Sequence, residues 1–238
     1  MALVGAALVA WVVAVQRMRG MDAGPGTDLG GLGWFLGIWV TMTAAMMLPS
    51  TAPMVLCYTR AARRPRTGAF VAGYLLAWTG YGVAAYGAFR LVAGAGFGWL
   101  AWDREGPLVA GAAIATAGLY ELTPLKEACL RRCRGPLQHV LHGWRRGRLG
   151  ALRMGAEHGV VCIGCCWGLM LALFALGVMS LFWTALVAVA IFAEKALPRG
   201  LALTRLLAVA LVALGLVVAL TPARVPELTQ PTPMRMGP

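Results

Sequence analysis

Charged residues are scarce in this chain, and acidic ones are the scarcest. Asp, Glu, Lys and Arg make up 13% of the 238 residues, against about 25% in soluble globular proteins. Hydrophobic residues make up 60%, which excludes an ordinary soluble enzyme with a polar surface. Nine acidic residues stand against 21 basic ones, a formal net charge of +12. In a soluble chain that excess would indicate a nucleic-acid partner, so the positions of the charges decide its meaning.

The sequence also lacks a nucleotide-binding loop and room for a soluble domain. It has no Gly-x-x-x-x-Gly-Lys-[Ser/Thr] segment, and the polar stretch 124–150 is too short for a nucleotide-driven pump. The first apolar run, Ala2 to Val15, has neither a basic start nor a small-residue cleavage site. We therefore expect a retained helix there rather than a signal peptide.

Apolar runs predict an all-α polytopic bundle of about seven transmembrane helices. The runs are 2–15, 33–58, 67–93, 107–123, 151–176, 178–197 and 201–220. A spanning helix needs roughly 20 apolar residues, and the first run is the shortest, so six spans are the alternative. We expect one membrane domain over residues 1–220 and a flexible, proline-rich tail over 221–238.

The basic residues predict the orientation of that bundle, because Lys and Arg concentrate in short cytoplasmic loops. Most of them flank the ends of the second, fourth and sixth runs: Arg60, Arg63, Arg64, Arg66, Lys126, Arg131, Arg132, Arg134, Arg145, Arg146, Arg148, Arg153, Lys195, Arg199 and Arg205. The opposite side keeps Arg17, Arg19, Arg90, Arg104, Arg224 and Arg235. The N-terminus is then cytoplasmic and the tail outside. Membrane lipids with anionic headgroups account for the basic excess, and no nucleic-acid partner is expected.

Sulfur and proline share one face of the second run. At about 100° per residue, Met42, Met46, Pro49 and Pro53 fall within one arc of a helix. Each proline removes a backbone donor, so we expect a kink and nearby hydroxyls that satisfy the freed carbonyls. Methionine also fills gaps in cores, so packing is the alternative role.

The fifth run carries a sharper signal. His158, Cys162, Cys165 and Cys166 fit within about 100° of one helical arc. A lone membrane cysteine is usually an inert small hydrophobe. Three cysteines within five residues, one turn after a histidine, favour a metal site.

A further cysteine pair follows the fourth run. Cys129 and Cys133 would share one helical face one turn apart, a spacing that suits either a shared metal or a structural contact. Neighbouring basic residues favour the thiolate and equally mark a membrane end. We interpret Glu194-Lys195, at the end of the sixth run, as an ion pair or a snorkelling lysine.

Depth along the helices connects these clusters. Met46 and Cys162 each lie roughly 15 Å above the cytoplasmic ends of their runs at about 1.5 Å per residue, with Cys129 and Cys133 below them at the mouth. Thiolate and thioether ligands select Cu(I), whereas Cys with His also suits Zn(II). We expect Cu(I), with Zn(II) as the alternative. A reducing compartment makes stable disulfides unexpected.

Several motifs, in the same order, resemble a bacterial and archaeal family of predicted metal-binding integral membrane proteins. This is a domain-of-unknown-function family sometimes labelled a copper chaperone. The matching segments are Trp39 to Pro53, Tyr120 to Cys133, His158 to Met170 and Glu194-Lys195. The resemblance covers a core of about residues 34–200. It implies metal binding, with copper first, and fits a multi-pass protein of the bacterial or archaeal inner membrane. Glu121 departs from the family, which usually has glutamine there.

Three functions remain open at this stage. The leading one is transport or delivery of Cu(I) through an intramembrane site, with a metal-delivery protein as a further partner and no catalytic residue. Its expected ligands are Met42, Met46, Cys129, Cys133, His158, Cys162, Cys165 and Cys166. A membrane thiol-disulfide oxidoreductase using Cys162 with Cys165 or Cys166 is the second. A passive assembly partner, in which sulfur fills space, is the third.

Overall fold

The computed structural model describes residues 2–18, 29–62, 64–94, 106–137, 140, 144–177, 180–197 and 200–221. Within these ranges the chain forms eight helices and no strand, which confirms the predicted all-α fold. They are α1 (Ala2–Met18), α2 (Leu32–Ala61), α3 (Arg64–Gly94), α4 (Gly106–Glu121), α5 (Pro124–Arg134), α7 (Gly147–Gly177), α8 (Leu181–Ala196) and α9 (Gly200–Leu220). The predicted flexible tail lies outside the described residues from 222 onward.

Each of the seven predicted apolar runs falls on a helix, but fewer helices have the length of a span. Four are long and apolar enough to cross a membrane: α2, residues 66–91 of α3, α7 and residues 202–220 of α9. The pair α4 and α5 adds a fifth if it counts as one broken span. With 17 and 16 residues, α1 and α8 rise only about 24 to 26 Å, short of a hydrocarbon core of about 30 Å. The described helices therefore support four or five spans by length and composition.

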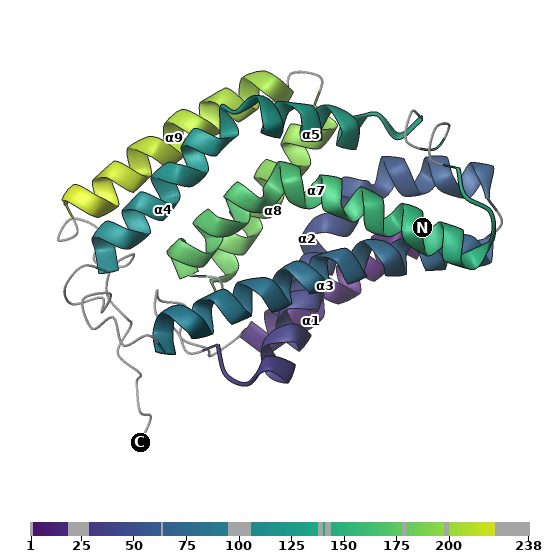
Figure 1. The fold of residues 1–238 in the computed structure, drawn as a ribbon, viewed down its shortest axis with the longest axis horizontal. Coiled ribbons are helices and arrows are strands. Elements are labelled where there is room, and N and C mark those ends of the chain that lie inside the picture. The colour runs from purple at the N-terminus through teal and green to yellow at the C-terminus, as the bar shows by residue number, and fades with distance from the viewer. Residues whose placement is uncertain are drawn as a thin grey trace.

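Glycine lets two pairs of helices approach closely, and both pairs run side by side in Figure 1. Between α3 and α7, a Cβ atom at Gly155 would lie 1.9 Å from the carbonyl oxygen of Phe70. Between α4 and α9, a Cβ atom at Gly111 would lie 2.5 Å from the carbonyl oxygen of Gly215. Backbone meets backbone at both crossings, as small residues permit between apolar helices.

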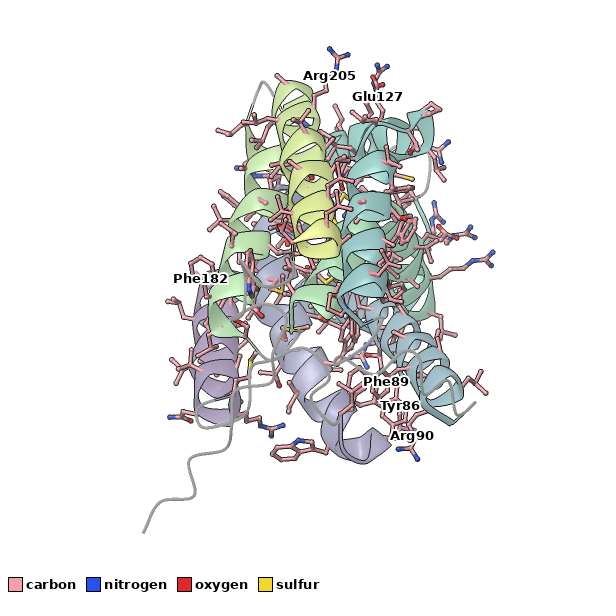
Figure 2. All side chains as sticks on the ribbon, turned by 90° about the vertical axis from the view of Figure 1, so that its left-hand side faces the viewer. Tyr86, Phe89, Arg90, Glu127, Phe182 and Arg205 are labelled. Carbon is pink, nitrogen blue, oxygen red and sulfur yellow. The ribbon has the colours of Figure 1, made fainter. Side chains whose placement is uncertain are left out.

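Charged residues mark the two ends of the bundle. Figure 2 shows Arg205 of α9 and Glu127 of α5 at one end, and Arg90 of α3 at the opposite end. The sequence assigns Arg205 and Arg90 to opposite sides by their loops, and the two side chains lie accordingly.

The helix α2 continues through both of its prolines from Leu32 to Ala61. Hydroxyl groups near them bond to the backbone: Ser50 Oγ and Thr51 Oγ1 donate to the carbonyl oxygen of Met47 at 3.0 and 2.5 Å. The carbonyls that Pro49 and Pro53 leave free are those of Ala45 and Pro49, so these two bonds do not replace the lost donors. Both side chains are buried. Ser50 thereby faces the interior of the protein.

The largest core cluster contains most of the sulfur-bearing residues of α2 and α7. It includes Met42 and Met46 of α2 with Cys162, Cys165 and Cys166 of α7, all of them at most 1% exposed. Partly buried side chains of α5 pack against the same cluster, among them Cys129 and Cys133. Residues far apart in the sequence thus meet in one core.

Candidate metal centre

Three cysteine sulfur atoms from two helices converge in this core. Cys162 and Cys165 lie about one turn apart on α7, and Cys133 reaches them from α5. Their Sγ atoms all lie within 4.8 Å of one another. Cys162 and Cys165 are completely buried, and Cys133 is partly exposed. We call these residues the three-cysteine group. All three are free thiols, so each has a sulfur atom available to a metal.

A fourth thiol extends the group along α7. Cys166 Sγ lies 3.3 Å from Cys165 Sγ, and Cys165 Sγ donates to the carbonyl oxygen of Cys162 at 3.2 Å. Cys166 is also buried. Neighbouring sulfur atoms therefore lie within 3.5 Å of one another from Cys133 at the edge of the core, through Cys165, to Cys166 inside it.

A bend between two helices brings Cys133 to this position. The axes of α4 and α5 differ by 64°, since Pro124 begins a new helix that cannot continue α4. Thr123 caps α5: its Oγ1 accepts a hydrogen bond from Lys126 N at 3.3 Å and donates to the carbonyl oxygen of Tyr120 at 2.7 Å. The sequence places Cys133 at a mouth below the cysteines of α7. The bend instead brings its sulfur to 3.5 Å from that of Cys165.

Cys129 lies one turn earlier on α5 and outside the three-cysteine group. A Cβ atom at Gly164 would come 2.8 Å from Cys129 Sγ, so this sulfur rests against the backbone of α7. The Tyr120 hydroxyl donates to the carbonyl oxygen of the same glycine. Cys129 therefore contacts α7 beside the group, and its expected role as a ligand stays a prediction.

His158 and the two methionines are buried near the group by different contacts. The His158 ring lies 6.2 Å from the ring centre of Phe70 and 5.9 Å from that of Tyr74, both on α3. The group as defined by its ligand atoms does not include this histidine. Met42 and Met46 share the core cluster with the cysteines. These three remain predicted ligands.

Side chains from two further helices, α3 and α8, reach the sulfur of Cys162. The Tyr74 hydroxyl on α3 lies 3.1 Å from Cys162 Sγ. Lys195 Nζ on α8 donates to the same sulfur at 3.0 Å and to Ser50 Oγ on α2 at 3.3 Å. The Tyr74 hydroxyl is neutral and the Lys195 ammonium is cationic, so Lys195 places a positive charge beside Cys162 in the core.

Sequence reasoning missed this contact of Lys195. The lysine was interpreted as the partner of Glu194 or as a snorkelling side chain, and the structure corrects both interpretations. Lys195 Nζ contacts Cys162 and Ser50, while Glu194 pairs with Lys126. The available signal was an ionisable residue at the end of an apolar run, where desolvation is costly and a functional role is the default.

A buried ion triad lies beside the thiols. Lys126 Nζ lies 2.5 Å from Glu121 Oε2 and 3.0 Å from Glu194 Oε2, and all three side chains are at most 1% exposed. It joins α4, α5 and α8. Glu121 therefore has a defined partner in Lys126. Removing one member of such a network leaves buried charge without compensation, so the triad holds α5 and its cysteines in place.

Fold and site together define the class: an all-α protein with a cluster of thiols able to bind a metal. Clustered buried thiols are soft ligands of the kind that bind Cu(I) or Zn(II), and here helices far apart in sequence supply them. The chain belongs to the family described as PpoB2, copper chaperone, whose profile matches residues 36–218. This confirms the family resemblance of the sequence motifs. Comparison with curated proteins and with solved structures gave no match.

Proposed function

We propose that this protein binds Cu(I) as cargo in the three-cysteine group and passes it on as a membrane copper chaperone or transporter. One observation carries the proposal: the Sγ atoms of Cys133, Cys162 and Cys165 lie within 4.8 Å of one another. Thiolates select Cu(I) by softness, and the chain belongs to a copper chaperone family. Zn(II) is the competing ion, since thiolates bind it as well.

The difference in exposure among the four cysteine residues supports a direction of loading. Cys133 is partly exposed, whereas Cys162, Cys165 and Cys166 are buried. We propose that Cu(I) arrives at Cys133, donated by a metal-delivery protein, and moves inward by exchange of one thiolate for another. Each exchange breaks one copper–sulfur bond and forms one, so no electron is transferred. Met42 and Met46, in the same core cluster, are the proposed thioether ligands further along.

The proposed setting is a multi-pass protein of the bacterial or archaeal inner membrane with a cytoplasmic N-terminus. Four or five helices of sufficient length and hydropathy support it, together with the concentration of Lys and Arg in one set of loops. A reporter enzyme active only outside the cytoplasm, fused after residue 221, should be active. Activity only from fusions to the segment 135–146 would reverse the orientation.

The test of copper binding compares purified variants in detergent. Wild-type protein should take up Cu(I), and the variant Cys133→Ser/Cys162→Ser/Cys165→Ser should take up none. Cys57→Ser is the matched control, because Cys57 is also a free cysteine but packs against a different core cluster. Equal copper stoichiometry in the wild type and the triple variant would reject the proposed site.

A thiol-disulfide oxidoreductase is the weaker candidate. The three thiols of α7 are buried, and exchange requires a thiolate that a partner disulfide can reach. The remaining thiol of the cluster, Cys133, is only partly exposed and packs against the same core. Trapping of a mixed disulfide at Cys165 or Cys166 under oxidising conditions would favour the oxidoreductase.

A further inference from the structure

Lys195 directs a positive charge at the sulfur atom of Cys162. Its Nζ donates to Cys162 Sγ at 3.0 Å and to Ser50 Oγ at 3.3 Å. An ammonium group has three donors and accepts nothing, so both contacts orient it as a cation. The hydrogen bond to Ser50 on α2 fixes the position of the nitrogen beside α7. Any ion bound by Cys162 would have this ammonium as a neighbour.

We infer that Lys195 determines metal specificity by favouring a monovalent soft ion over a divalent one. The inference rests on the proposed function, because it concerns which ion the cysteines hold. It assigns Lys195 a positioning role through charge and does not make it a ligand, since an ammonium has no lone pair to donate.

The net charge of the site depends on which ion is bound. For the same number of thiolates, the complex with Cu(I) carries one negative charge more than the complex with Zn(II). Two thiolates with Cu(I) leave a single negative charge, whereas two thiolates with Zn(II) leave none. An adjacent ammonium therefore stabilises the negatively charged Cu(I) complex and has no net charge to attract in the Zn(II) complex. With three thiolates the net charge of each complex is more negative by one, so the Cu(I) complex still carries one negative charge more than the Zn(II) complex.

Burial strengthens the effect of that charge difference on the choice of ion. Cys162 and Cys165 are completely buried, and Ser50 is 8% exposed. Charges at such sites interact more strongly than in water, and salt screens them less. A difference of one unit charge at hydrogen-bond distance is therefore large enough to bias the choice of ion.

Tyr74 supplies a matched comparison at the same atom. Its hydroxyl lies 3.1 Å from Cys162 Sγ, at nearly the distance of Lys195, and it carries no charge. Removing this hydroxyl removes a hydrogen bond to the sulfur whichever ion is bound. Tyr74→Phe should therefore change both affinities by a similar factor.

The experiment measures Cu(I) and Zn(II) affinities of detergent-purified protein by competition with a chromophoric chelator, anaerobically for Cu(I). Lys195→Met should lower the Cu(I) preference over Zn(II) on the order of tenfold or more. Lys195→Arg retains the charge and should keep most of that preference. Tyr74→Phe should leave the ratio near that of the wild type.

The outcomes separate the inference from the proposed function. An unchanged Cu(I)-to-Zn(II) ratio in Lys195→Met, with or without an equal loss of both affinities, overturns the inference and leaves copper binding intact. Failure of the wild type to take up Cu(I) overturns both. If Lys195→Met does not fold, Lys195→Gln replaces it, because the amide can still donate to Ser50, and the same ratio decides.

Discussion

Cys133 and Cys165 bring their sulfur atoms to 3.5 Å from one another across 32 residues of sequence. One sulfur comes from a short helix after a bend, and the other from the middle of α7. The proposed copper site therefore depends on where α5 lies relative to α7. A movement of α5 would remove one ligand and leave the buried thiols of α7 in place.

Replacing Cys133 tests that dependence. Cys133→Ser should weaken Cu(I) binding by about 100-fold or more, because even the loss of a group behind a metal ligand typically costs 10–100-fold. Chelator competition gives the affinity. Cys129→Ser is the control, since Cys129 lies outside the three-cysteine group. An equal loss in both variants would mean that Cys129 and Cys133 bind copper as a pair on α5. It would contradict a site shared between α5 and α7.

The buried triad predicts a large effect on stability. Lys126→Met should lower the free energy of unfolding by about 3–5 kcal/mol, because it leaves Glu121 and Glu194 buried without their cation. Thermal unfolding in detergent measures the loss. Adding Glu121→Gln and Glu194→Gln to the same variant removes the uncompensated charge and should recover most of it. No recovery would mean that the lysine stem, rather than its charge, provides the stabilisation.

Periodicity and hydropathy predicted the helices well and the spans less well. All seven apolar runs lie on helices, because a long apolar stretch in a chain of low charge has few other stable forms. The number of spans depends on length: α8, with 16 residues, is shorter than its predicted run, whereas α1 extends beyond its run and still has only 17 residues. Ser180, for example, starts α8 by accepting a hydrogen bond from Trp183 N at 3.5 Å.

The candidate site was predictable as far as local spacing reaches. Helical geometry was sufficient to group Cys162, Cys165 and Cys166 on one face of α7. It did not determine that Cys133 joins them or that Lys195 bonds to Cys162. Those contacts depend on the 64° bend between α4 and α5 and on the packing of α8 against α7. Tertiary packing of this kind leaves no periodic signal in the sequence.

Close contact of α3 with α7 makes Gly155 sensitive to substitution. Gly155→Ala would place a Cβ atom 1.9 Å from the carbonyl oxygen of Phe70 and should cost about 1–3 kcal/mol as the helices separate. Gly80→Ala is the control on α3, since a Cβ atom there meets nothing within 4 Å. It should be neutral or stabilising by up to about 1 kcal/mol. Similar melting temperatures for the two variants would contradict this helix crossing.

The cap of α5 should affect copper affinity without touching a ligand. Thr123 Oγ1 accepts from Lys126 N at 3.3 Å, and losing such a cap costs about 1 kcal/mol of helix stability. If the first turn of α5 loosens, Cys133 is held less firmly beside Cys165, and Thr123→Ala should lose about fivefold in Cu(I) affinity. Thr123→Ser keeps the hydroxyl and should bind as the wild type does. Equal affinities in all three proteins would show that the buried triad positions α5 without help from its cap.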